Sequence, residues 1–266
     1  MHPRPMTPVL ALLALLLSAL LLPSASTSAS ASVRLPDPAQ DWDYQIGGAR
    51  GPGPTVGTVV RDRSEQPATG RYNVCYVNAF QTQSDERARW RRADRWDLVL
   101  STGAGPVVDG AWGEWLLDTR TAEKRHRLAG IIGGWLAGCA QDGFDAVEPD
   151  NLDSWSRSGG LLSPRDNLAL ARLITHRAHR LGLAVAQKNW AECRRCAAEV
   201  GFDFAVAEEC ARYDECGRYA AAYDDRVLVV EYRRADFERA CAEWGARLPV
   251  VLRDRDVTPG GADKHC

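Results

Sequence analysis

The segment GFDAVEPDNLDSW, residues 143–155, joins a helix end, a buried strand and an acidic turn in one short stretch. Gly143 is a typical residue to end a helix, and the apolar residues that follow it predict a strand. This strand runs directly into Glu148, Pro149 and Asp150, and the proline favours an extended conformation for the residue before it. Carboxylates at the end of a buried strand indicate the mouth of an active site. Asp and Asn also cap turns, so a surface turn is the alternative.

Helix and strand patterns alternate on both sides of this segment. Apolar residues recur at three- and four-residue steps over 128–139 and 170–181, and Ser163-Pro164 is a typical helix start. Further helices are predicted over 193–200, 213–223 and 237–244. Strands are predicted at 43–47, 56–62, 72–80, 96–101, 114–119, 144–151, 183–189, 202–210, 226–232 and 248–254. Strands that alternate with helices form parallel sheets, and this many in one chain predict a single-domain TIM-type (β/α)8 barrel of the α/β class.

Polar residues stand at the carboxyl end of most predicted strands. They are Asn78, Asp118, Glu148 and Asp150, Lys188 and Asn189, Glu208 and Glu209, Glu231, and Arg253 and Asp254. In a barrel of this type the carboxyl ends of the strands form the active face. We therefore expect these side chains to gather round one site.

The candidate catalytic groups of the sequence are mainly carboxylates. Two of them on opposite sides of a cleft are what glycoside hydrolysis requires, one as proton donor and the other as base or nucleophile. Aromatic residues at predicted loops are either sugar-stacking or core residues; these are Trp112, Trp155, Trp190 and Tyr213. Cys193 and Cys196 have the spacing of a metal or redox pair, but no second pair accompanies them, so a disulfide is the better interpretation. We expect no metal and no other cofactor.

The first residues are typical of a secretory signal peptide. Arg4 precedes an apolar run, residues 9–22, and small residues with suitable cleavage positions near Ala29 and Ala31 follow it. The run is shorter than a typical membrane span, which disfavours the alternative of a retained anchor. We therefore predict a signal peptide, residues 1–31, and a secreted, extracellular barrel domain, residues 32–266, without membrane contact once the leader is removed.

All eight cysteines follow the leader, as expected for an oxidising compartment. We expect Cys210 to pair with Cys216 across the loop after the Glu208 strand, Cys241 with Cys266 at the tail, and Cys193 with Cys196, which leaves Cys75 with Cys139. Eight cysteines allow about a hundred connectivities, so other pairings remain open at this point.

Several segments together resemble glycoside hydrolase family 114, the endo-α-1,4-polygalactosaminidase-like proteins. They include YQIGG, NVCYVNAFQTQ, GEWLLDTR, GFDAVEPDNLDSW, LAVAQKNWAE, GFDFAVAEEC and VVEYR, and they extend over nearly all of the chain after the leader. The resemblance implies a TIM-type barrel, internal cleavage of α-1,4-linked galactosamine and an Asp/Glu catalytic pair. The family's aspartate falls on Asp150 and its glutamate on Glu208. Glu209 stands where an amide is expected, which leaves open which of the two glutamates acts.

Strand alternation suggests where these carboxylates point. If Ala146 faces the barrel interior, Glu148 does too and Asp150 projects over the rim; the same alternation places Val206 and Glu208 on one face. We expect Asp150 to be the nucleophile or electrostatic partner and Glu208 the general acid/base. The candidate substrate-binding residues are Tyr76, Asp118, Glu148, Asn151, Lys188, Asn189 and Glu231, and Lys188 is a candidate to keep one carboxylate ionised.

The partner is therefore expected to be a galactosamine-containing polysaccharide, bound by a monomer. With 33 Lys and Arg against 35 Asp and Glu, a broad basic face for nucleic acid is not indicated. The leading hypothesis is a secreted glycoside hydrolase. The alternative is a barrel that has lost its chemistry and acts as an extracellular carbohydrate-binding protein. Fold does not separate the two, but the presence of both matched carboxylates favours the enzyme.

Overall fold

Eight parallel strands form the frame of the structure. In this computed structural model, which describes residues 1–2, 33–193 and 195–266, hydrogen bonds join each strand to the next. The strands are β1 (Asp41–Gln45), β2 (Val56–Asp62), β3 (Tyr72–Asn78), β8 (Ala146–Asp150), β9 (Ala184–Lys188), β10 (Phe204–Glu208), β11 (Val227–Glu231) and β12 (Val250–Arg253). A short ninth strand, β13 (Asp263–His265), pairs antiparallel with β12. The result is the expected TIM-type α/β barrel, and the predicted strands before residue 81 and after residue 143 are confirmed.

The barrel is nearly closed by side chains that join its first and last strands. The indole Nε1 of Trp42 on β1 donates to the carbonyl oxygens of Val229 and Pro249, at 3.2 and 3.1 Å. His265 on β13 lies 3.0 Å from the carbonyl oxygen of Trp42 through its Nε2. Beside them, Asp43 and Arg253 form a fully buried ion pair at 3.0 Å. These contacts connect the two ends of the sheet, which no ladder of backbone hydrogen bonds joins among the described residues.

Two predicted strands are not barrel strands. Residues 96–101 contain the 3-10 helix η2 (Trp96–Leu98), and residues 114–119 contain only the two-residue strand β7 (Glu114–Trp115). Both belong to an insertion between β3 and α2, which also holds η1 (Ser84–Glu86), α1 (Arg87–Trp90), β4 (Ser101–Thr102), β5 (Gly105–Pro106) and β6 (Val108–Asp109). The apolar residues of both segments do form part of a core, since four leucines in them are fully buried, namely Leu98, Leu100, Leu116 and Leu117. A short apolar run does not distinguish a barrel strand from the core of an insertion.

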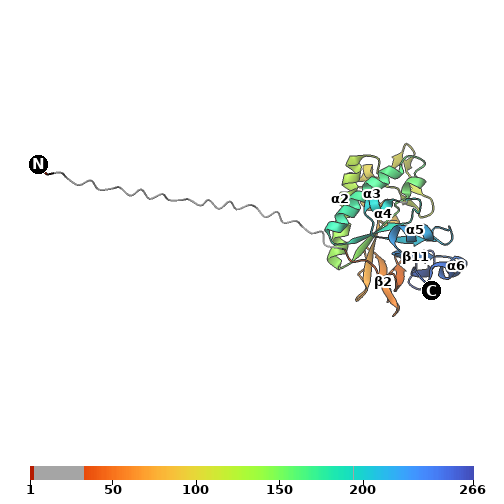
Figure 1. Cartoon of the computed structure of the whole chain (residues 1–266). Helices are drawn as coiled ribbons and strands as arrows, with labels where there is room; N and C mark the ends of the chain where they lie inside the picture. The colour runs from red at the N-terminus through yellow and green to blue at the C-terminus, as the bar shows by residue number, and fades with distance from the viewer. Residues whose placement is uncertain (3–32, 194) are drawn as a thin grey trace. The chain divides into compact units, whose positions relative to one another are not determined.

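The helices begin and end where local signals predict. Thr121 caps α2 (Ala122–Asp142), and Gly143 follows it in the left-handed conformation at φ 93°. Ser163 caps α3 (Pro164–Arg180) by accepting the N–H of Asp166 in a capping box. These two helices lie side by side on the outside of the barrel (Figure 1). The remaining helical segments are η3 (Ser154–Arg157), α4 (Cys196–Val200), α5 (Cys216–Tyr223) and α6 (Arg234–Trp244).

Alternate residues of each strand face two different cores. Ala146 and Val206 belong to the cluster inside the barrel, whereas Val147 and Ala207 pack in the cluster that also includes residues of α2 and α3. Ala146 and Val206 therefore face the barrel interior, which directs the following residues on the same side, Glu148 and Glu208, toward the barrel axis.

Four disulfides brace the described chain, and all four predicted pairings are confirmed. They are Cys75–Cys139, Cys193–Cys196, Cys210–Cys216 and Cys241–Cys266. The first ties β3 to α2 and the last ties α6 to the chain end. The predicted signal peptide, residues 1–31, lies outside the described residues apart from its first two. None of the helices described here is both long and apolar enough for a membrane span.

Candidate active site

Four neighbouring strands end in the polar residues that form the site. β3, β8, β9 and β10 end at Asn78, Asp150, Lys188 and Glu208. Because parallel strands present their carboxyl ends at the same rim, these side chains meet there. A cavity of about 330 Å³ lies over them, and Asp150, Lys188 and Glu208 line it. The sequence prediction that residues 143–155 reach a cavity at the barrel mouth agrees with this arrangement.

Lys188 lies at the centre of the site. Its Nζ is 2.8 Å from Glu148 Oε1, 3.2 Å from Asp150 Oδ1 and 3.4 Å from Glu208 Oε2, and it donates to the Tyr44 hydroxyl at 2.8 Å. The side chain is only 2% exposed. Burial alone would lower the pKa of Lys188, but the surrounding carboxylates raise it well above its usual value. Lys188 is therefore a permanent cation under two carboxylates of the cavity.

Asp150 is held in its ionised form. The Tyr76 hydroxyl donates to its Oδ2 at 2.7 Å, and Lys188 contacts its other oxygen. Burial alone would raise the pKa of Asp150, yet the Lys188 ammonium and the Tyr76 hydrogen bond hold it below its usual value. Asn151 stabilises the same corner, since its Nδ2 is 3.4 Å from Asp150 Oδ2. A carboxylate with these partners is suited to act as an anion.

Glu208 is fixed by two neutral donors. Asn189 Nδ2 donates to its Oε2 at 2.8 Å, and Asn189 Oδ1 accepts the Glu208 backbone N–H at 2.9 Å. The Tyr232 hydroxyl donates to Oε1. Burial raises the pKa of Tyr232 well above its usual value, so it stays a donor. Tyr232 was missed by the sequence analysis; its only signal was its position as the last residue of the strand predicted over residues 226–232.

Glu148 lies below the cavity, inside the barrel. It is completely buried, and its Oε1 accepts the Tyr44 hydroxyl at 2.8 Å as well as contacting Lys188. Burial raises the pKa of Glu148 to about 7. Glu148 does not line the cavity. It therefore supports Lys188 from below and makes no wall for a ligand.

The residue after each of three site strands, β8, β9 and β10, turns sharply. Asn151, Asn189 and Glu209 follow β8, β9 and β10 with φ of 65°, 52° and 55°. Asn tolerates this left-handed region, whereas a glutamate there is strained by roughly 1 kcal/mol. The turn separates the two adjacent glutamates. Glu208 lines the first cavity, while Glu209 pairs with Arg212 at 2.6 Å and Arg255 at 3.0 Å.

Besides Glu148, two further predicted site residues do not reach the cavity. Asp118 is buried in the segment that precedes α2, where it pairs with Lys124 at 2.6 Å and Arg120 at 2.7 Å. The segment before it is not a barrel strand, so it does not end at the barrel rim. Glu231 is a true strand end, but its Oε1 accepts the N–H of Ala211, at 2.8 Å, and anchors the loop after β10.

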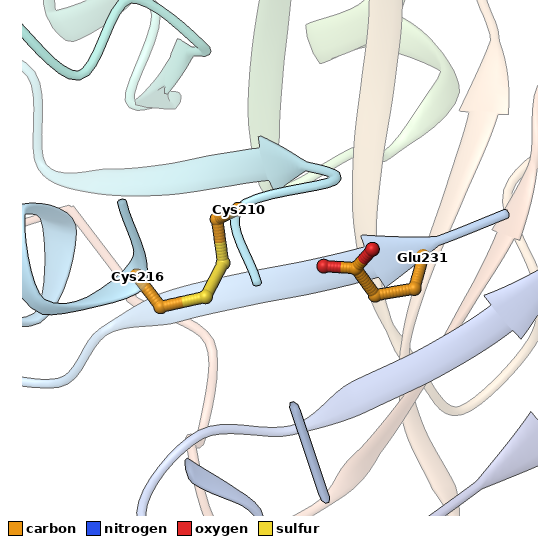
Figure 2. Close-up of side chains that lie close together, drawn as sticks. All are labelled: Cys210, Cys216 and Glu231. Atoms are coloured by element: carbon orange, nitrogen blue, oxygen red, sulfur yellow. A yellow bond between two sulfur atoms is a disulfide. The ribbon is translucent and has the colours of Figure 1, made fainter. Parts of the chain in front are cut away.

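Glu231 points toward the Cys210–Cys216 disulfide, as Figure 2 shows. Among the described residues, these three form a group whose potential ligand atoms lie within 4.8 Å of one another. Because the sulfurs are bonded to each other, they are not available as thiolate ligands. The group is better described as a brace for the loop that follows Glu208.

A second cavity of about 630 Å³ adjoins the first. Trp112, Asn189, Glu208 and Tyr232 line both, so the two cavities form one groove. All four aromatic residues proposed from the sequence line the second cavity, namely Trp112, Trp155, Trp190 and Tyr213. The rings of Trp155 and Trp190 lie 5.6 Å apart, centroid to centroid. Aromatic faces in an open groove are suited to stack on sugar rings.

The insertion and the loops add residues that the sequence analysis did not select. Glu114 from β7 and Asp109 from β6 line the first cavity, and Arg157 and Arg255 line both. The Arg255 guanidinium lies over the rings of Trp112 and Tyr232, at 5.5 and 5.4 Å from their centroids. No strand-end pattern marks these residues, because none of them ends a barrel strand.

Comparison with known proteins identifies the relatives of this chain. The family model of glycoside-hydrolase family GH114 matches residues 23–266. The crystal structure of Aspergillus fumigatus Ega3 in complex with galactosamine superposes with a TM-score of 0.70 at 19% identity, covering 88% of this chain and 97% of that one. The glycoside hydrolase domain of PelA from Pseudomonas aeruginosa gives 0.55 at 14% identity, covering 85% and 98%. At these identities the likeness concerns the fold alone. No curated protein matches the chain.

Proposed function

The chain belongs to glycoside-hydrolase family GH114 and is therefore a glycoside hydrolase, and we propose that it cleaves galactosamine-containing polymers internally with Asp150 and Glu208 as its catalytic pair. The observation that carries this proposal is the position of Lys188. One buried ammonium contacts both carboxylates, at 3.2 and 3.4 Å, on the floor of a groove open to solvent. Two carboxylates facing one cavity are the machinery that glycoside hydrolysis requires.

The environments of the two carboxylates support different roles. Asp150 is held ionised by Lys188 and Tyr76, which suits a nucleophile. Glu208 accepts hydrogen bonds from Asn189 and Tyr232, which fix its carboxylate at the cavity, as a positioned acid/base requires. Glu209 is paired with two arginines, so Glu208 is the better candidate of the two.

The reaction proceeds in two steps in this proposal. Glu208 gives its proton to the glycosidic oxygen as the bond from that oxygen to C1 breaks, and Asp150 bonds to C1. Glu208 then takes a proton from water, and the water oxygen bonds to C1 as the bond to Asp150 breaks. Lys188 keeps its charge throughout and stabilises Asp150 each time it carries the negative charge.

Cleavage within a polymer is supported by the shape of the groove. The two cavities meet at Glu208, and the aromatic residues lie mainly in the second one. A chain bound across both cavities would extend to either side of the scissile bond. Ring stacking on Trp155 and Trp190 would hold the units farther from the reacting centre.

The acidic residues of the groove support galactosamine as the sugar. Asp109, Glu114 and Asp153 line the first cavity, and Glu192 and Glu215 line the second. A polymer that carries ammonium groups is attracted to such a groove. The structural likeness to Ega3, whose crystal structure is a complex with galactosamine, supports the same sugar class.

Export is supported by the disulfides. Four disulfides in the described chain are typical of a protein that matures in an oxidising compartment. We therefore retain the division into a signal peptide, residues 1–31, and a secreted barrel domain, residues 32–266. An absence of free thiols in the denatured, unreduced protein recovered from culture medium would support export with full pairing.

The substrate is tested with three polymers. Reducing ends should appear from partly or fully deacetylated α-1,4-galactosaminan and not from chitosan or polygalacturonate. A rapid fall in polymer length before monomers appear would support internal cleavage. The opposite ranking of polymers would refute the proposed substrate. Tight binding of galactosaminan without any cleavage would instead support the carbohydrate-binding alternative.

A further inference from the structure

Glu114 differs from the other carboxylates of the first cavity in that no described residue forms an ion pair with it. Five carboxylates line this cavity, namely Asp109, Glu114, Asp150, Asp153 and Glu208. Arg157 pairs with Asp109 and Asp153, each at 3.0 Å, and Lys188 pairs with the proposed catalytic pair. Within the described part of the chain, Glu114 makes no ion pair. It is therefore a carboxylate of this cavity that no described cation contacts directly.

The side chain of Glu114 is nevertheless fixed in place. Its Oε2 accepts the Asn78 amide at 2.9 Å, and the Asn78 Oδ1 accepts the Asn151 amide at 3.0 Å. Asn151 directly follows Asp150, so this chain of amides holds Glu114 relative to Asp150. Its other oxygen, Oε1, has no hydrogen-bond partner among the described residues. One oxygen is thus anchored and the other is free to accept from a ligand.

The surroundings of Glu114 favour a positive ligand. Burial raises the pKa of Glu114 to about 7, and the nearby charges of Asp150 and Asp109 act in the same direction. A cation that binds beside this carboxylate would remove the unfavourable effect of these like charges and favour its ionised form. A neutral ligand group would leave the effect in place.

We propose that Glu114 binds the ammonium group of a deacetylated sugar unit next to Asp150 and so sets a preference for deacetylated over acetylated units. The inference rests on the proposed function for the identity of the polymer. An ammonium group donates to the free oxygen and supplies the missing positive charge. An acetylated nitrogen supplies neither the charge nor the compact shape. Recognition therefore comes from the insertion between β3 and α2, whereas the proposed chemistry comes from the barrel strands.

The kinetic test uses Glu114→Gln, with Glu243→Gln as the matched control on an exposed surface of α6. The substrates are fully deacetylated galactosaminan and the same polymer after chemical N-acetylation. Glu114→Gln should lower kcat/KM for the deacetylated polymer by about 10-fold or more, mainly through KM, as expected for a lost charge-assisted contact. The acetylated polymer should be cleaved as by the wild type. Glu114→Asp should recover part of the loss, because it retains the charge.

A binding test separates this inference from the proposed function. In a Glu208→Gln background, calorimetry compares galactosamine oligomers with their N-acetylated forms, with and without Glu114→Gln. If the double variant no longer prefers deacetylated over acetylated oligomers, the inference about Glu114 is supported. This holds even if the wild type cleaves neither polymer, a result that would refute only the proposed function. An equal loss on both ligands, an equal fall in kcat on both polymers, or no change at all would overturn the role of Glu114.

Discussion

Lys188 and Glu148 form a buried ion pair, with Nζ and Oε1 2.8 Å apart, directly beneath the two proposed catalytic carboxylates. Above the pair, Asp150 and Glu208 share the same ammonium group and line the cavity together with Lys188. Lys188 ends β9, and Glu148 lies two residues before the end of the neighbouring strand β8. Both side chains are on the interior face, so strand alternation brings them together. The barrel thus supplies a fixed cation to its rim.

Removing that cation should affect both activity and stability. Lys188→Met leaves Glu148 and Asp150 buried without a counter-charge, which should destabilise the fold by roughly 3 kcal/mol. Turnover should fall by about 10²-fold or more, because both carboxylates lose their shared anchor. Glu148→Gln leaves Lys188 paired with Asp150 and Glu208, so it should retain much more turnover. Denaturant unfolding and initial rates at one pH measure the two effects, and equal turnover of the two variants would contradict the assigned role of Lys188.

The proposed catalytic pair predicts a severe loss of turnover for two variants and a mild loss for a third. Asp150→Asn and Glu208→Gln should each reduce turnover by about 10³-fold or more, since one removes a nucleophile and the other a positioned acid/base. Glu209→Gln should reduce it far less, because Glu209 is neutralised by Arg212 and Arg255. Thermal melts of all three variants check the fold. A well-folded Asp150→Asn or Glu208→Gln variant with normal turnover would reassign that role.

The buried carboxyl group of Glu231 should make the stability of the fold depend on pH, independently of catalysis. Burial raises its pKa to about 7 from an ordinary value of 4.5. The folded protein therefore holds this proton more tightly than the unfolded chain. The resulting stability is fully present below about pH 4.5 and is lost as the pH rises through about 7. Glu231→Gln stays neutral and can still accept the Ala211 N–H, so it should be more stable than the wild type above pH 7, by on the order of 1–2 kcal/mol.

Unfolding in denaturant at pH 5 and pH 8 measures this difference, with Glu243→Gln as the exposed control. The stability gain of Glu231→Gln should be small at pH 5 and larger at pH 8. Because Glu148 and Glu114 also have pKa values raised to about 7, only the difference between variant and wild type isolates Glu231. A gain independent of pH would show that Glu231 stays ionised in the fold.

Much of this architecture follows from local sequence signals. Strands with β-branched cores and helices with clear caps, such as Ser163 and Gly143, were predicted because the deciding contacts are near in sequence. Asp150, Lys188 and Glu208 were predicted as neighbours because parallel strands end at one rim. Asp118 was expected at the same rim, but it follows a segment that packs inside an insertion. That outcome depends on tertiary contacts that a short apolar run does not encode.

The insertion also explains which site residues were missed. Glu114 reaches the first cavity only because β6 and β7 fold back over the barrel mouth, and no periodicity marks that path. Arg255 lies beyond β12 and approaches Trp112, far away in the sequence, through stacking alone. Barrel geometry therefore predicts the proposed catalytic residues, whereas the loops that would select the substrate are determined by long-range packing.

The stereochemical outcome follows from the shared contact with Lys188. Asp150 Oδ1 and Glu208 Oε2 lie 3.2 and 3.4 Å from the same Nζ, so their separation is at most the sum of these distances. That limit falls at the lower edge of the roughly 6.5–9.5 Å that separates the carboxyl groups of inverting enzymes, and it is reached only if the three atoms lie on one line. Any bend brings these two oxygens closer together, which favours the separation of roughly 5 Å that is typical of retaining enzymes. We therefore expect the first product to keep the α configuration at C1. Proton NMR of the newly formed reducing ends, recorded before mutarotation, measures this, and added methanol should yield the α-methyl glycoside. Initial formation of the β anomer would show that Asp150 activates water instead of bonding to C1.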